Sequence, residues 1–77
     1  MSQYADEAFV VMLRIYGPNG FAEQAKYVVG CSTREAAEAR IKSFFPPEAD
    51  VRVFASPLSK RETADLNLLP NEIRQRP

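Results

Sequence analysis

Residues 32–45, STREAAEARIKSFF, decide the fold, because the start, the period and the end of this stretch all indicate one helix. Ser32 and Glu35 have the spacing of a capping box, in which the serine hydroxyl accepts from the Glu35 amide and the carboxylate reaches back. Two prolines follow directly and end the helix. The core-facing positions recur at helical spacing: Ala37, Ile41 and Phe44. A helix of about three turns is marginal alone, so a sheet must cover this stripe.

The composition is typical of one small folded domain. The chain has 77 residues, of which 45% are hydrophobic and 26% charged, which is too apolar for a disordered segment. A single cysteine excludes an internal disulfide, so an oxidising compartment would add nothing to the stability of the fold. No stretch approaches the roughly 20 apolar residues of a membrane span, and residues 1–7 are polar and acidic, unlike a signal peptide. We therefore predict a cytoplasmic protein with no membrane partner.

The first predicted element is a strand over residues 8–16, which are rich in β-branched and aromatic side chains. Alternation places four large apolar residues on one face: Phe9, Val11, Leu13 and Ile15. The second face carries a mixed set: Ala8, Val10, Met12, Arg14 and Tyr16. Because neither face is clearly polar, we expect both faces of this strand to be covered.

The turn residues 17–20, Gly-Pro-Asn-Gly, predict a chain reversal into a second strand over residues 24–31. A helical turn over residues 21–26 is the alternative. After the helix, residues 50–55 alternate as a third strand. Strand, helix and strand make the two flanking strands parallel, with the first strand between them and antiparallel to both. The predicted fold class is therefore α+β, with a three-stranded sheet in the order 2-1-3.

The C-terminal part is predicted to be a short helix followed by a tail. Ser59 and Glu62 repeat the capping-box spacing, and Pro70 ends a helix that we expect to reach about Leu68. We expect residues 71–77 to form a partly ordered tail. The predicted organisation is a single domain of three parts: a loose leader (1–7), a ββαβ core (8–56) and the C-terminal helix or tail (57–77).

The chain contains no histidine, which excludes Ser-His-Asp and Cys-His nucleophilic pairs and histidine-ligated zinc. One cysteine also excludes thiolate metal clusters within a single chain. Glu48 and Asp50 flank one alanine in a proline-led loop, a pattern better interpreted as solvated charges than as a cation site or an acid–base pair. The sequence therefore predicts a non-enzymatic protein with no metal and no cofactor.

Two further features precede the helix. Cys31 lies beside the predicted cap, where a helix dipole can favour a thiolate, but a buried structural cysteine is the preferred interpretation. An enzyme that uses Cys31 ranks last among our hypotheses. Ser32, Thr33 and Arg34 supply hydroxyls, amides and a guanidinium for an anion site, although capping and solvation also explain them.

The second face of the sheet has more apolar surface than one helix can cover, since that helix lies on the other face. Such surplus surface is typical of an interface. The predicted partner-binding residues are Val10, Met12, Arg14, Tyr16 and Phe54. The alternative is internal cover by the C-terminal segment, through Leu66, Leu68, Leu69 and Ile73. The leading hypothesis is a protein-interaction module that binds a protein partner or forms a homodimer.

A nucleic-acid-binding accessory protein is the second hypothesis, because arginines and aromatic residues interleave on the predicted sheet. Its candidate residues are Arg14, Arg52, Lys60 and Arg61. Ten basic and ten acidic residues give zero net charge, which argues against this role unless the cations cluster locally. A third hypothesis is an inhibitor protein of a phage or mobile element, a class in which short neutral chains occur, but no motif supports it.

Overall fold

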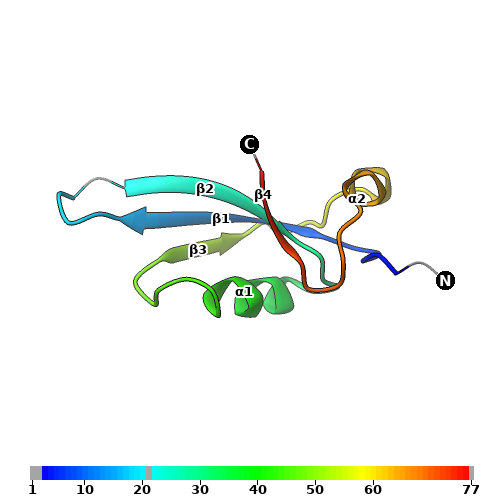
Figure 1. The fold of residues 1–77 in the computed structure, drawn as a ribbon, viewed down its shortest axis with the longest axis horizontal. Helices are drawn as coiled ribbons and strands as arrows, with labels where there is room; N and C mark the ends of the chain where they lie inside the picture. The colour runs from blue at the N-terminus through cyan, green and yellow to red at the C-terminus, as the bar shows by residue number, and fades with distance from the viewer. Residues whose placement is uncertain (1–2, 21, 77) are drawn as a thin grey trace.

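The computed structural model describes residues 3–20 and 22–76. Residues 1–2 of the predicted leader, Phe21 of the alternative helical turn and Pro77 of the predicted tail lie outside the described residues. The described elements, shown in Figure 1, are β1 (Phe9–Tyr16), β2 (Ala22–Val29), α1 (Arg34–Lys42), β3 (Asp50–Val53), α2 (Lys60–Leu66) and β4 (Ile73–Arg76).

The strands form one antiparallel sheet in the order β3-β1-β2-β4. The α+β class is confirmed, and so is the 2-1-3 arrangement of the first three strands. The prediction of three strands is wrong, because the segment expected to be a tail adds β4 beside β2. Backbone bonds join this segment to Gly30, whose amide donates to Glu72 at 3.0 Å and whose carbonyl accepts from Asn71 at 2.7 Å.

The hairpin between β1 and β2 forms as the turn residues predict. The amide of Gly20 donates to the Gly17 carbonyl at 3.1 Å, and Gly20 has a φ of 83°, which favours glycine. β1 and β2 pair along their whole length, from Phe9 opposite Val29 to Tyr16 opposite Ala22. Residues 22–26 are therefore extended, and the alternative of a helical turn is wrong for them.

The helix α1 covers the first face of the sheet. Ala37 and Ile41 are fully buried against Phe9, Val11 and Leu13 of β1. The helix ends at Lys42, whereas the sequence predicted that it would continue to Phe45.

Phe44 is consequently exposed rather than in the core, and the Arg40 guanidinium lies 4.7 Å from its ring centroid. Phe45 packs against the core in its place, with its ring 5.3 Å from that of Tyr27. The predicted apolar stripe is therefore correct for Ala37 and Ile41 and wrong by one residue at its C-terminal end.

The predicted cap of α1 is also wrong by one residue. Thr33, not Ser32, is the N-cap, and its hydroxyl accepts from the Ala36 amide at 3.1 Å. Two adjacent hydroxyl residues offer the same capping chemistry, so the sequence pattern alone does not decide between them. At α2 the predicted cap is confirmed, because Ser59 accepts from the Glu62 amide at 3.1 Å and donates to the Glu62 carboxylate at 3.0 Å.

A second, smaller core lies on the other face of the sheet, at the end where the leader enters. It contains Ala8, Val28 and Leu68, packed by partly buried Ala5, Leu58 and Leu66. The Ala5 amide donates to the Leu68 carbonyl at 2.7 Å, so the segment predicted as a loose leader is tied to the C-terminal part. Figure 1 shows α1 and α2 on opposite sides of the sheet. The C-terminal segment thus covers one half of the second face.

Candidate functional site

The half of the second face that α2 leaves open is organised in rows across the strands. Because paired residues of antiparallel strands lie side by side on the same face, the register defines each row. The central row crosses all four strands: Arg52, Met12, Lys26 and Arg76. The next row, towards the hairpin, crosses three strands: Asp50, Arg14 and Gln24. Three of the four residues in the central row are therefore cationic.

We name the four exposed cations of these rows the basic face: Arg14, Lys26, Arg52 and Arg76. Three strand spacings separate Arg52 from Arg76, or about 14 Å between backbones, and the rows lie about 7 Å apart. Asp50 is the only described carboxylate in these rows, and its oxygen lies 3.9 Å from the Arg52 Nε. Among the described residues, no carboxylate forms an ion pair with Arg14, Lys26 or Arg76.

Arg74 lies beside the basic face but is already engaged within the chain. Its guanidinium donates to the Glu72 carboxylate at 2.8 Å and to the Leu66 carbonyl. These bonds hold β4 against the end of α2, so Arg74 acts as a structural tie. The hydrogen bond from the Leu69 amide, followed by the bond from Arg74, lowers the pKa of Glu72.

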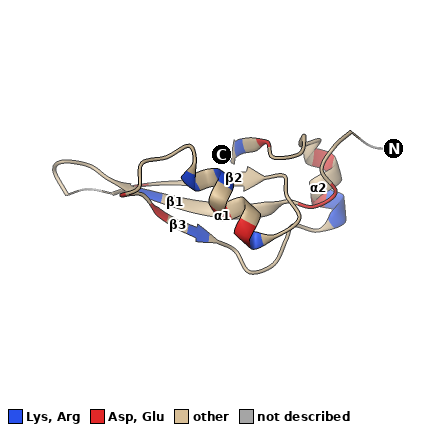
Figure 2. Ribbon diagram, turned by 90° about the horizontal axis from the view of Figure 1, so that it is seen from below, with Lys and Arg blue, Asp and Glu red and all other residues tan. Residues whose placement is uncertain are grey.

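Most of the acidic residues that bring the net charge of the chain to zero lie outside the rows of the basic face. Figure 2 shows segments of both signs on α1 and α2. Glu38 and Lys42 form an ion pair of 2.8 Å along α1, which covers the first face, and this bond lowers the pKa of Glu38. Glu23 lies opposite Ile15, on the first face. The zero net charge of the chain therefore conceals a local cluster of cations.

Apolar and aromatic side chains accompany the cations. Met12 lies half-buried at the centre of the basic face, and Gln24 donates to its sulfur at 3.1 Å. Hollows of about 420 and 100 Å³ flank Met12 on its two sides.

Two aromatic side chains lie near the ends of this surface. Tyr16, at the hairpin end of β1, is 57% exposed, and Phe54, just beyond β3, is 43% exposed. The Phe54 amide donates to the Val10 carbonyl at 2.9 Å, which keeps Phe54 in register on the face of Arg52.

The structure separates the predicted partner-binding residues into two groups. Met12, Arg14, Tyr16 and Phe54 lie on the open half of the face. Val10 is only 6% exposed and pairs with Val28, beneath the cover that the chain itself provides. Of the residues predicted to give that cover, Leu68 is fully buried and Leu66 partly buried, whereas Leu69 is half exposed.

Sequence reasoning missed Lys26 and Arg76. The register of the hairpin would have placed Lys26 beside Met12, but turns of different length give different registers. Arg76 lay in the segment predicted to be a tail.

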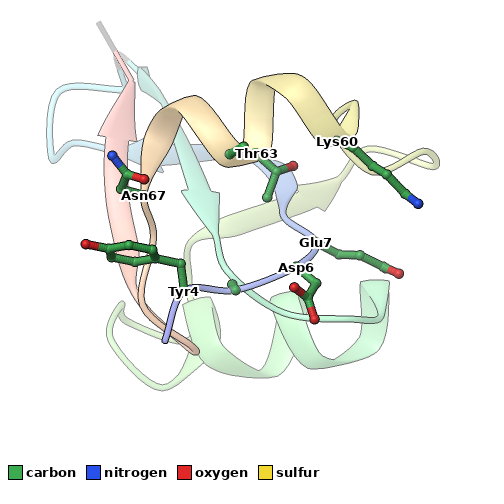
Figure 3. Close-up of a pocket in the computed structure, with 8 residues that line it drawn as sticks. Tyr4, Asp6, Glu7, Lys60, Thr63 and Asn67 are labelled. Carbon is green, nitrogen blue, oxygen red and sulfur yellow. The ribbon is translucent and has the colours of Figure 1, made fainter. Parts of the chain in front are cut away.

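The candidate nucleic-acid residues are not brought together. Arg14 and Arg52 belong to the basic face, but Lys60 and Arg61 begin α2. Lys60 lines a separate groove of about 570 Å³ between α2 and the leader, drawn in Figure 3. Asp6 and Glu7 line the same groove, so it carries charges of both signs and does not favour a ligand of one sign.

Side chains of the predicted anion site already form hydrogen bonds within the chain. The Thr33 hydroxyl caps α1, and the Arg34 guanidinium donates to the Val53 carbonyl at 3.3 Å. Ser32 is exposed beside them. Two of the three predicted ligands therefore already have structural roles.

Cys31 is half-buried, and its thiol donates to the Thr33 carbonyl at 3.3 Å. Burial raises the pKa of this thiol, and the nearby Glu7 carboxylate raises it further. A raised pKa lowers the thiolate fraction at neutral pH, so the surroundings of Cys31 do not activate it as a nucleophile.

In the described part of the chain, no three or more histidine, cysteine, aspartate or glutamate side chains gather where they could hold a metal ion, so Glu48 and Asp50 belong to no such cluster. None of the helices among the described residues has the length and apolar character needed to cross a bilayer. Comparison of the chain with protein-family models, curated proteins and solved structures finds no significant match.

Proposed function

We propose that the protein is a non-enzymatic binding module whose basic face binds a negatively charged partner. One observation carries this proposal: four exposed cations and a single carboxylate share one open half of the sheet in a chain of zero net charge. Cations concentrated on one face give a local positive potential that attracts and orients an anionic partner.

Self-association through the same surface is the weaker alternative. A two-fold contact presents each patch to its own copy, so the row of Arg52, Lys26 and Arg76 would face an identical row. Like charges in direct opposition destabilise such an interface. The apolar surface that first suggested a dimer is also smaller than expected, because α2 and Leu68 cover the Val10 end.

An enzymatic role has less support than binding. The chain has no histidine, and burial raises the pKa of its one thiol. The hollows beside Met12 are open and shallow rather than enclosing, so they do not exclude water from a bound substrate.

The proposal is tested by the binding of labelled polyanions at low ionic strength, followed by fluorescence anisotropy. An oligothymidylate and polyglutamate serve as the two probes. The double variant Lys26→Glu/Arg52→Glu should weaken binding about tenfold or more, since it removes two of the four cations of the face. The matched control is Lys60→Glu/Arg61→Glu, which changes the net charge equally on α2.

The control variant should keep wild-type affinity. If both double variants weaken binding equally, the effect comes from net charge and the basic face is not the site. If the wild-type protein binds neither probe at low salt, the proposal is wrong. Light scattering in the same buffer measures the mass, and a monomer under these conditions argues against self-association through the basic face.

A further inference from the structure

We infer that the anionic partner is single-stranded nucleic acid, with its backbone held by the basic face and its bases stacked on Tyr16 and Phe54. This inference rests on the proposed function, since it specifies the partner of the same surface. It begins from the positions of the two aromatic rings. Both are exposed: Tyr16 is the last residue of β1, and Phe54 directly follows β3, where its amide extends the pairing with β1 by donating to the Val10 carbonyl.

The geometry of the face suits a flexible single strand. Tyr16 lies six positions after Val10 in β1, and Val10 is the residue that accepts from the Phe54 amide. Six residue steps of an extended chain span about 20 Å. The cationic rows lie between these two ends. A strand that runs along the face thus meets an aromatic ring at each end and cations between them, the combination that binds single strands without sequence preference.

Met12 adds an apolar platform at the centre. It is half-buried between Arg52 and Lys26 in the central row, where an unstacked base can rest on its thioether. The arginine guanidinium planes can stack on bases as well as pair with phosphates.

A duplex fits this surface less well. Reading a duplex requires a helix or a two-stranded ribbon that enters a groove. The ribbon that projects from this fold is the β1–β2 hairpin, and residues 15–23 at its tip contain no lysine or arginine and include Glu23. The cations lie on the open sheet instead, away from the ribbon that could enter a groove.

An acidic protein would bind the cations but does not require exposed aromatic rings. The contribution of the aromatic residues to binding therefore distinguishes an acidic protein from a single-stranded nucleic acid.

The test compares three probes of equal charge: an oligothymidylate, a duplex and polyglutamate. Tyr16→Leu and Phe54→Leu remove the ring and keep an apolar side chain. Stacking of one base contributes enough that each variant should weaken binding to the oligothymidylate about 5- to 150-fold, with polyglutamate binding unchanged.

Two controls keep this test decisive. Phe44→Leu removes an exposed ring that lies beside Arg40 of α1, and it should leave all affinities unchanged. Tyr16→Phe keeps the ring and should retain the wild-type affinity. Circular dichroism identifies any variant that has lost its fold, and the Leu variant that remains folded then carries the test of stacking.

The outcomes separate this inference from the proposed function. If the Leu variants bind the oligothymidylate like the wild type, or if the duplex binds more tightly, the single-strand inference is overturned while the basic face remains a polyanion site. If only polyglutamate binds, the partner is an acidic protein. If no probe binds at low salt, both proposals fail together.

Discussion

Replacing Leu68 by alanine measures how much the C-terminal segment stabilises the sheet that carries the basic face. Leu68 is fully buried with Ala8 and Val28, and it is the one large side chain of that smaller core with no exposed surface. Leucine-to-alanine changes at such sites cost about 2–5 kcal/mol, because the transfer free energy is lost and a cavity remains. A domain of this length has roughly 4–12 kcal/mol in total, so Leu68→Ala should remove a large fraction of it.

The neighbouring residue supplies the control. Leu69 is half exposed and forms hydrogen bonds through its backbone amide and carbonyl, so Leu69→Ala should change the stability by about 0.5 kcal/mol or less. Urea denaturation followed by circular dichroism measures both variants. With an m-value of about 1.5 kcal/mol/M, in the lower half of the usual range of about 1–3 kcal/mol/M, a loss of about 3 kcal/mol lowers the urea midpoint by roughly 2 M. Equal midpoints for Leu68→Ala and Leu69→Ala would refute the claim that the C-terminal segment covers the second face.

Three further predictions concern the fold. Thr33→Ala should cost about 0.5–2 kcal/mol and Ser32→Ala close to none in the same urea assay, and the reverse ranking would move the cap back to Ser32. Gly30→Ala should destabilise by about 1–3 kcal/mol, because its Cβ would lie 2.8 Å from the Leu69 carbonyl oxygen, and a midpoint at or above wild type would count against this close approach. The Leu69 amide lowers the pKa of Glu72 in the folded state, so its ionised carboxylate stabilises the fold at neutral pH and this stability is lost as the pH falls below the ordinary value of about 4.3. Urea midpoints measured between neutral pH and pH 3 should fall less steeply for Glu72→Gln than for the wild type, and parallel curves would contradict this assignment.

The elements with strong local signals were predictable from the sequence. The Gly-Pro-Asn-Gly turn, the alternation of β1 and the helical spacing of Ala37 and Ile41 each depend on neighbouring residues, and each matches the structure. β4 was not predictable in this way, because Ile73 is its only large apolar residue. Its extended form depends on backbone pairing with β2 and on the bonds of Arg74, which join residues far apart in the sequence.

The candidate site was predictable only in part, because some of its residues are brought together by pairing between distant strands. Alternation within β1 places Met12, Arg14 and Tyr16 on one face without any knowledge of the fold. Lys26 and Arg76 join them only through strand register, which brings residues from β2 and β4 into the row of Met12. The net charge of zero does not describe this surface, since a sum over the chain does not record on which face each charge lies.

The most direct test of the basic face is to map where a polyanion binds on the folded protein. Amide chemical shifts of isotope-labelled protein, titrated with a short oligothymidylate at low salt, locate the surface residue by residue. The largest changes should fall on Met12, Lys26 and Arg52, and the affinity should fall roughly fiftyfold between about 50 and 200 mM salt, as expected for about four phosphate contacts. Changes confined to α1 or to the groove between α2 and the leader, or an affinity that does not respond to salt, would contradict the assignment of this surface.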